Sequence, residues 1–414
     1  MNRFRVVDLF CGCGGMSRGF QRTGRYDVEY GVELEKHPAA TFETNIRNSF
    51  GNPTRVYQGD ILDLLKSKDS LWGELNAAHI TAPGQIDVLI GGPPCQGFSR
   101  NGVRKYSEEG GRFYDDPRNH LYKAFLDMLD ALRPKIVLIE NVREFLNYGD
   151  GKFSRDLLKR LDELGYTADY RKICAADFGV PQVRHRVFFV AVSREFARLN
   201  VEELPFPVPN FQKTDGQAGL FGGAPYRTVR DALWDLPSPT YEHGVAIPYD
   251  NRKRVGDFAE KMRSASGEVT SHVARELSAK TRDRVKAVGT GRMKHIDDSL
   301  KTKKFYGSAY RRLDWDEPAL TITTWVYHVG SGRFAHPVED RGITMREAAR
   351  LQSFDDDFQF PDLINPVSQM IGNAVPPTVA QCFAETFLQL LDGKTKGGKA
   401  KLGRSSIAAT KPKK

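Results

Sequence analysis

Long apolar runs and cysteines are both scarce in this chain of 414 residues, and each scarcity excludes a class of protein. No apolar run approaches the roughly 20 residues of a membrane-spanning helix, so we expect no membrane partner. Met1–Arg5 leads directly into a predicted strand, which is unlike a secretory signal. Five scattered cysteines, an odd number, are typical of a cytoplasmic protein without a disulfide framework. Cys11 and Cys13 have no second pair to complete a zinc site, so we expect no metal.

Positive charge is concentrated at one end of the chain. The net charge is +9, but residues 393–414 contain eight Lys or Arg and no acidic residue, so the remainder is close to neutral. This segment is also rich in Gly and Ser, and its composition predicts a basic disordered tail. Loose contact with nucleic acid and a merely solubilising role both remain open for it.

Strands and helices alternate through the first half of the sequence. Seven segments have the pattern of strands: 4–9, 26–32, 55–58, 87–90, 136–140, 167–173 and 186–192. Helical patterns lie between most of them, including 38–48, 120–132 and 153–164. This alternation predicts an α/β fold with a Rossmann-like, doubly wound, mostly parallel seven-stranded sheet. The last two strands have no helical pattern between them, so we expect an antiparallel hairpin at the sheet edge.

The pattern becomes irregular after residue 197 and regular again after residue 340. The intervening part has many turn signals and mixes aromatic with basic residues. Helical periodicity returns at 344–354 and 377–391, and the second of these helices is expected to pack against the first domain. We therefore divide the chain into a sheet domain (1–197 plus 366–392), a smaller irregular domain (198–340), a hinge with a helix (341–365) and the tail (393–414).

A glycine-rich turn follows the first predicted strand, in the sequence Asp8 to Gly15. Such a turn lets a backbone approach a ligand closely and directs helix amides toward it. Glu33 lies at the end of the second strand, where an acid accepts from ribose hydroxyls, and Asp60 ends the third. No Lys that could grip a phosphate follows the glycines. This arrangement favours an adenosyl cofactor, although a dinucleotide, a ligand-free turn and a helix-capping role for Asp60 remain alternatives.

The sequence GGPPCQGFS, residues 91–99, places a thiol just beyond the fourth predicted strand. Open α/β sheets bind ligands at the carboxyl ends of their strands. Two prolines stiffen the turn before Cys95, as the position of a nucleophile requires. A small buried thiol in a loop is the simpler alternative.

Charged side chains follow two further strands. Glu140 ends the fifth strand and should face the same crevice as Cys95. Arg184 and Arg186 lie two residues apart at the entry to the last strand, so alternation would put both on one face. They could direct two guanidinium groups into one pocket, or they could instead pair with surface acids.

Taken together, these motifs resemble those of the DNA (cytosine-5)-methyltransferases, in the same order from about residue 5 to 380. Six segments carry the resemblance: 8–20, 91–99, 140–142, 182–186, 346–354 and 369–377. The irregular domain and the tail are not covered. One departure is Asp355, where the family usually has proline; we expect it to loosen that turn without touching the chemistry.

The resemblance implies S-adenosyl-L-methionine as the cofactor, released as S-adenosyl-L-homocysteine. It implies a cofactor site made of Phe10, Gly12, Gly14, Gly15, Glu33, Leu34, Asp60, Ile61, Pro93, Asn373 and Ala374. It implies four catalytic residues: Cys95 as the nucleophile, Glu140 at ring nitrogen 3, Arg186 at the base carbonyl, and Arg184 orienting the site and the backbone phosphate. Ser99, Arg100, Asn101 and Arg118 would belong to a lid over an extruded base.

The implied partner is double-stranded DNA, read by the irregular domain, which would be a target recognition domain. We expect a monomer in the cytoplasm, associated with the nucleoid, serving a restriction–modification or other phage-defence system. Three alternatives are weighed. A relative acting on transfer RNA would carry a Cys-Phe-Thr signature that is absent here. An inactive DNA-binding module would not need the intact catalytic set, and a nicotinamide oxidoreductase would leave Cys95 unexplained.

Overall fold

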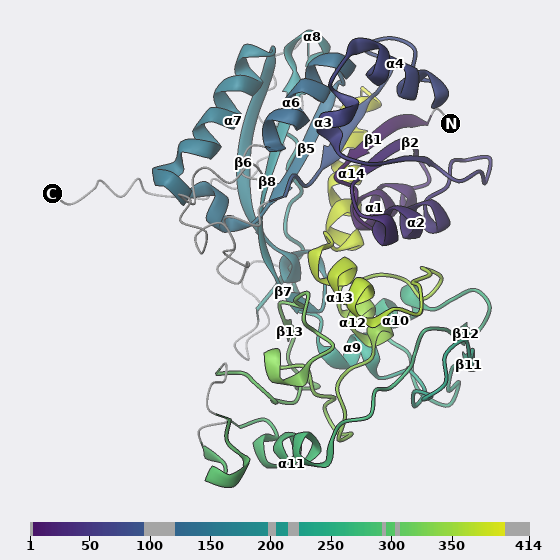
Figure 1. Ribbon diagram of the computed structural model, residues 1–414, viewed down its shortest axis with the longest axis vertical. Helices are drawn as coiled ribbons and strands as arrows, with labels where there is room; N and C mark the ends of the chain where they lie inside the picture. Colours follow the sequence, from purple (N-terminus) through teal and green to yellow (C-terminus); the bar gives the residue numbers. More distant parts are fainter. Residues whose placement is uncertain are drawn as a thin grey trace, which may run out of the picture.

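Seven strands form one sheet at the centre of the first domain (Figure 1). The computed structural model describes residues 3–94, 121–197, 204–213, 223–291, 295–302 and 307–393. The strands are β1 (Phe4–Leu9), β2 (Tyr26–Glu33), β3 (Arg55–Gln58), β4 (Val88–Gly91), β5 (Ile136–Asn141), β6 (Tyr166–Cys174) and β8 (His185–Ser193). Their order in the sheet is β3-β2-β1-β4-β5-β8-β6.

β1 to β5 are parallel to one another, and β8 runs antiparallel to both β5 and β6. The predicted antiparallel pair is confirmed, with β6 at the edge and β8 between β6 and β5. Parallel strands carry their carboxyl ends to one edge of the sheet. The ends of β1, β2, β4 and β5 therefore share that edge.

Helices cover both faces of the sheet, because successive side chains of a buried strand point to opposite faces and both must leave water. One face is covered by α3 (Ile61–Leu64), α4 (Lys68–Ala77), α6 (Leu121–Leu132) and α7 (Lys152–Glu163). The other is covered by α1 (Gly15–Arg22), α2 (Lys36–Asn45) and α14 (Pro377–Leu391). The bounds of α14 match the prediction, and Figure 1 shows this C-terminal helix beside α1. The prediction for α2 ran three residues too far, because Ile46 is already extended (φ −99°, ψ 120°).

Short elements connect the sheet to the rest of the chain. They are η3 (Arg143–Leu146), η4 (Tyr148–Gly151), η5 (Ala175–Phe178), β7 (Gln182–Val183) and α8 (Arg194–Ala197). β7 pairs in parallel with β13 (Ala319–Leu320), so the segment that enters β8 is joined directly to the second domain.

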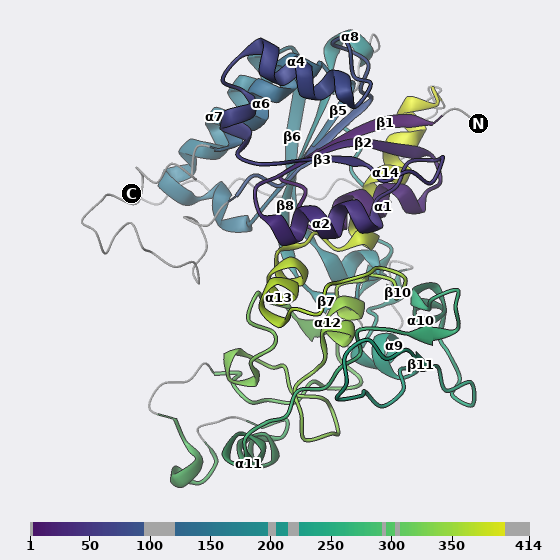
Figure 2. The ribbon, with the colours of Figure 1, turned by 45° about the vertical axis from the view of Figure 1, so that its right-hand side comes forward.

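The second domain has little regular structure and lies below the sheet in Figures 1 and 2. Its remaining elements are β9 (Phe211–Gln212), β10 (Ala224–Pro225), α9 (Val229–Leu233), β11 (Ile247–Pro248), α10 (Asp257–Met262), β12 (Glu268–Val269), α11 (Ala279–Val288), η7 (Asp298–Leu300) and η8 (Val329–Ser331). Each strand here is two residues long, too short for an alternating pattern to be recognised in the sequence.

Two later helices, α12 (Met345–Leu351) and α13 (Ile364–Asn373), lie where the two parts of the molecule meet (Figure 2). Thr344 and Glu347 form a capping box that begins α12, and Ser353 has a left-handed φ of 63° just beyond its end. The helix is thus shorter than the predicted 344–354. Both helices share a hydrophobic cluster with α9 and α10, whereas α14 packs on the sheet. The domain boundaries proposed from the sequence stay predictions.

Buried charges occupy the centre of this second cluster. Arg350 has no exposed surface, and its guanidinium donates to Asp235 (Nη1–Oδ1 2.7 Å) and to Asp356 (Nη2–Oδ2 2.6 Å). Arg346 is equally buried and donates to the carbonyls of Thr270, Asp355 and Phe358. Buried charges need such partners, because an unpaired charge away from water is strongly destabilising.

Candidate active site

The turn after β1 has the geometry of a ligand-binding loop. Phe10 and Gly12 both have a φ of 56°, and Gly14 has a φ of 94°. A Cβ atom added to Gly12 would meet nothing within 4 Å, so its backbone faces open space. Gly15 is the opposite case: an added Cβ would lie 2.6 Å from the carbonyl of Val375, so only glycine fits there. The turn is therefore packed tightly at Gly15, against Val375, and open at Gly12, where a ligand could approach the backbone.

The acidic residues predicted at the ends of β2 and β3 lie close to this turn or to a helix start. Glu33 accepts from the amides of Gly12 (2.8 Å) and Glu35 (2.9 Å), and burial raises its pKa. The next residue, Leu34, is apolar and 57% exposed. Asp60 accepts from the amide of Leu62 (2.9 Å), which is the capping role left open from the sequence, and Ile61 behind it is buried.

Asp8 is a buried acid within the glycine-turn motif, and it was not predicted to belong to the site. Its Oδ2 accepts from the hydroxyl of Ser17 (2.6 Å), and its Oδ1 has no hydrogen-bond partner among the described residues. Burial raises the pKa of Asp8 to about 7, against the hydrogen bond from Ser17, and nearby Glu33 adds to the rise. The signal available in the sequence was an acid next to the last residue of the first predicted strand, after two valines.

The last predicted cofactor residues come from the end of α13. Asn373 is exposed, and Ala374 lies against the turn, with its Cβ 3.2 Å from the position of a Cβ on Gly15. The carbonyl of Met370, one turn earlier, accepts weakly from the thiol of Cys13 (3.9 Å). Residues more than 350 positions apart thus form one side of the same loop.

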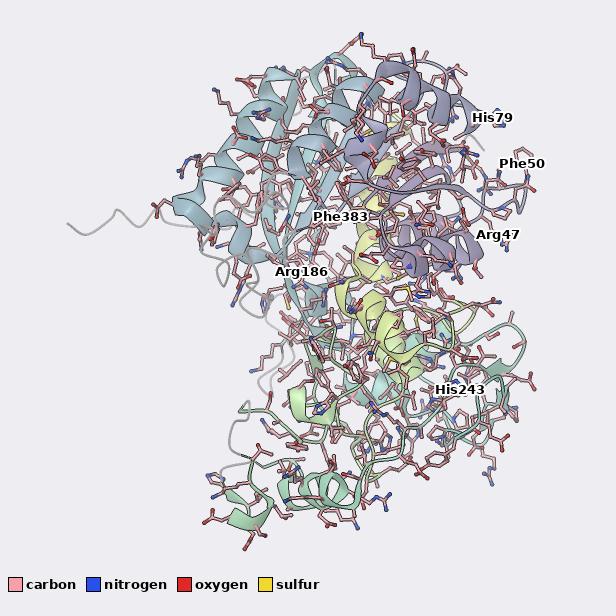
Figure 3. The ribbon with its side chains drawn as sticks, in the orientation of Figure 1. Arg47, Phe50, His79, Arg186, His243 and Phe383 are labelled. Carbon is pink, nitrogen blue, oxygen red and sulfur yellow. The ribbon has the colours of Figure 1, made fainter. Side chains whose placement is uncertain are left out.

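Glu140 and Arg186 form an ion pair at the carboxyl end of β5. Arg186 Nε lies 2.9 Å from Glu140 Oε1, and both side chains are largely buried. Burial raises the pKa of Glu140, although Arg186 and Arg184 oppose the rise. Figure 3 shows Arg186 at the level where the sheet meets the second domain. The sequence placed each of these side chains at the site separately, and the ion pair between them was not predicted.

The segment before Cys95 contacts this ion pair. A Cβ on Gly92 would be 3.3 Å from Glu140 Oε2. The side chain of Asn141 donates to the carbonyl of Pro93 (3.3 Å), and both residues are buried. The end of β4 is therefore fixed against the end of β5. Cys95 itself lies outside the described residues, as do the predicted lid residues Ser99, Arg100, Asn101 and Arg118.

Arg184 is placed differently from the expectation. Its side chain is 1% exposed and donates to the carbonyls of Ile322 (3.1 Å) and Gly372 (2.8 Å). A guanidinium buried in this way does not reach a phosphate of a bound duplex, so that part of the prediction is corrected. Gln182 acts with it, accepting from the amide of Ile322 (2.8 Å) and donating to Gln352 (2.8 Å). Together they tie the strand entering the site to the second domain.

Asp355 also corrects an expectation. The turn that contains it is not loosened by the replacement of proline, because Asp355 accepts from Arg18 and Arg22 on α1.

A family model for C-5 cytosine-specific DNA methylases matches residues 4–389. The chain belongs to this family. It is accordingly a DNA (cytosine-5)-methyltransferase, as the order of its motifs predicted. Two curated relatives cover nearly the whole chain. The type II methyltransferase M.AgeI of Thalassovita gelatinovora is 30% identical over 92% of this chain and 98% of its own length. The type II methyltransferase M1.HphI of Haemophilus parahaemolyticus is 32% identical over 93% of this chain and 86% of its own length.

Solved structures give the same fold for this methyltransferase. A DNA modification methyltransferase encoded within a prophage of E. coli has a TM-score of 0.69 and 27% identity, covering 94% of this chain and 99% of that one. The Dnmt2 methyltransferase of S. pombe shares the fold with a TM-score of 0.54 at 16% identity. The predicted S-adenosylmethionine-dependent methyltransferase fold is thereby confirmed.

Among the described residues, no group of three or more His, Cys, Asp or Glu side chains is arranged to hold a metal ion. Within the same residues, no helix combines the length and apolarity that crossing a membrane requires.

Proposed function

We propose that this methyltransferase binds S-adenosyl-L-methionine at the glycine turn and methylates carbon 5 of a cytosine extruded from duplex DNA. The turn fits the cofactor: the backbone at Gly12 faces open space, the Glu33 carboxylate lies beside it, and Leu34 offers an exposed apolar surface for an adenine ring. When bound, the cofactor supplies an electrophilic methyl group on a sulfonium. Phe10, Asp60, Ile61, Pro93 and Asn373 are the further proposed contacts.

The observation that carries the proposal is the Glu140–Arg186 pair beside the segment leading to Cys95. A carboxyl group whose pKa is raised can be protonated and then donate to ring nitrogen 3 of cytosine. Arg186 can donate to the adjacent ring carbonyl, since a guanidinium presents several N–H groups in one plane. The pair thus has the donors needed to hold a pyrimidine ring and to draw electrons toward nitrogen 3.

The proposed role of Cys95 follows from the chemistry of cytosine, whose carbon 5 is a poor nucleophile. The Cys95 thiolate adds to carbon 6 while Glu140 protonates nitrogen 3, which leaves an enamine with electron density at carbon 5. Carbon 5 then takes the methyl group. A base next removes the proton from carbon 5, the bond between sulfur and carbon 6 breaks, and the ring regains its double bond. A free thiol is only a few per cent ionised near neutrality, so its surroundings must favour the thiolate.

A base inside a duplex cannot reach such a thiol, so the target nucleotide must leave the stack. We propose that Ser99, Arg100, Asn101 and Arg118 belong to the lid that closes over it, and that residues 198–340 read base edges and grip phosphates. Arg184 contributes by holding the site's strand rather than by contacting DNA.

The biological role is proposed from the names of the relatives. M.AgeI and M1.HphI are both named type II methyltransferases, and an enzyme of that kind protects host DNA in a restriction–modification or related phage-defence system. We accordingly propose a cytoplasmic enzyme that acts on the nucleoid as a monomer.

A methyl-transfer assay tests the proposal. The protein is incubated with tritiated S-adenosylmethionine and either unmethylated phage DNA or bulk transfer RNA, and Cys95→Ala is assayed in parallel. We expect label in DNA, at carbon 5 of cytosine after digestion to nucleosides, and no label with the variant. Label in RNA alone, or equal label with Cys95→Ala, would contradict the proposed substrate or nucleophile.

A further inference from the structure

The turn after α12 joins the two halves of the molecule through two neighbouring carboxylates, Asp355 and Asp356. Asp355 is 7% exposed and accepts from Arg18 (Nε–Oδ2 2.9 Å and Nη2–Oδ1 2.7 Å) and from Arg22 (Nη2–Oδ2 2.9 Å). Burial alone would raise the pKa of Asp355, but the two arginines outweigh it and lower the pKa to about 2. The carboxylate is therefore ionised throughout the neutral range.

Both arginines belong to α1, the helix that begins at the glycine turn. Arg18 and Arg22 are one helical turn apart, so they project from one face of the helix. The amide of Arg18 donates to the carbonyl of Gly14 (2.8 Å), which connects the anchored part of the helix to the turn itself. Because α1 has only eight residues, any shift at Arg18 also moves Gly12–Gly15.

Asp356 faces the second domain. Its carboxylate accepts from Arg350 (Nη2–Oδ2 2.6 Å) and from the hydroxyl of Tyr249 (2.5 Å), and its amide donates to the carbonyl of Met262 (2.7 Å). Asp355 and Asp356, which are adjacent in the chain, thus connect α1 to the buried charged centre of the second domain. Only one peptide unit separates them, so a displacement of one residue should be passed to the other.

We propose that Asp355 is a positioning residue for the cofactor: through it, the second domain holds α1 so that the glycine turn is ready to bind S-adenosylmethionine. The inference rests on the proposed cofactor. Asp355 touches no reacting atom, and its effect should fall on binding rather than on the chemical step.

The test is calorimetric binding of S-adenosylhomocysteine to the full chain and to Asp355→Asn, well below the unfolding midpoint of either. We expect the variant to bind about tenfold more weakly, within the range usual for coupling between sites. Asp355→Glu, which keeps the charge, should recover most of the affinity. In the methyl-transfer assay, KM for S-adenosylmethionine should rise and kcat should change little.

The matched control is Asp392→Asn. Asp392 pairs with Arg25 through two contacts (Nη2–Oδ1 2.6 Å and Nη1–Oδ2 3.2 Å), joining the chain beyond the far end of α1 to the end of α14. Losing that pair should lower the unfolding midpoint without changing affinity for S-adenosylhomocysteine. Should Asp355→Asn not fold, Arg18→Gln replaces it, with the same expected loss of affinity.

The outcomes separate the inference from the proposed function. If the unaltered protein does not bind S-adenosylhomocysteine, the proposed cofactor is wrong, and the role of Asp355 fails with it. If the protein binds and Asp355→Asn binds equally well, or loses no more affinity than Asp392→Asn, the cofactor stands and the positioning role is refuted.

Discussion

The buried space between the sheet and its helices is largely apolar, whereas two arginines, Arg346 and Arg350, lie at the centre of the second domain. In the sheet domain, the buried carboxylates of Asp8 and Glu140 lie toward the carboxyl ends of β1 and β5, at the edge of the candidate site. In the second domain, the buried carboxylates of Asp235 and Asp356 are fully engaged with arginine. We therefore expect buried acids to serve the proposed chemistry in the sheet domain and the packing in the second domain.

The largest effect expected from this difference is on activity. Glu140→Gln keeps the shape of the side chain but cannot supply a proton in the same way, so we expect the rate of methyl transfer to fall about 10²- to 10⁴-fold, as for the loss of a general acid. The substitution also removes the charge that pairs with Arg186, so the unfolding midpoint should fall, and rates are compared well below it. Rates are measured with tritiated S-adenosylmethionine on unmethylated phage DNA.

Glu144→Gln is the matched control for that substitution. Glu144 lies four residues further on, in η3, and pairs with Arg143 (3.1 Å) at the surface. Its replacement should leave the rate unchanged. A Glu140→Gln enzyme with the rate of the Glu144→Gln enzyme would show that Glu140 has no part in the chemistry.

The same contrast explains how much could be predicted from the sequence. Strands such as Ile136–Asn141 were predictable because they are apolar on both faces, and the position of Glu140 was predictable because parallel strands end at one edge. Arg186 lies at that edge for another reason: it begins β8, which runs antiparallel to β5. The second domain was not predictable in detail. Arg346 and Arg350 look like surface residues in a sequence, and their burial depends on partners from distant segments.

Distant partners also explain the individual errors at the site. Arg184 has two carbonyl partners, in Ile322 and Gly372, that follow it by more than 130 residues. The arginine partners of Asp355 precede it by more than 330 residues. Local sequence patterns contain no information on such distant pairs. For that reason the sequence suggested a phosphate contact for Arg184 and a loosened turn at Asp355, and the tertiary contacts of both residues contradict these expectations.

The second-largest effect concerns stability. Arg350→Met removes the charge that partners Asp235 and Asp356 and leaves two buried carboxylates without it. We expect a loss of about 3–5 kcal/mol, as for breaking a buried ion pair from one side, measured by chemical denaturation. Arg252→Met is the control: Arg252 pairs with Asp250 at the surface, and its loss should leave the unfolding curve in place. If Arg350→Met and Arg252→Met gave the same denaturation curve, the buried charges of the second domain would not have the structural role that we assign to them.

The smallest effects are on the pH dependence of stability, and their signs differ between the domains. Burial would raise the pKa of Glu347 in the second domain, but Arg341 outweighs it and lowers the pKa to about 2, below the ordinary 4.5. A depressed folded-state pKa stabilises the protein above pH 4.5, and that contribution disappears as the pH falls toward 2. The melting temperature of the unaltered protein should therefore exceed that of Glu347→Gln near neutrality, and the gap should narrow below pH 4.5.

Asp8 should behave in the opposite way, because burial raises its pKa from 3.8 to about 7. Between these values the folded state binds more protons than the unfolded state, so the contribution of Asp8 to stability declines as the pH rises. Asp8→Asn cannot ionise and can still accept from Ser17, so it should gain melting temperature relative to the unaltered protein from pH 4 to pH 7. The two windows overlap only between pH 3.8 and 4.5, so difference curves from one pH series separate them on either side of that range. A difference curve for Asp8→Asn that stays flat from pH 4 to pH 7 would mean that this acid is not held neutral by burial, and the contrast with Glu347 would be lost.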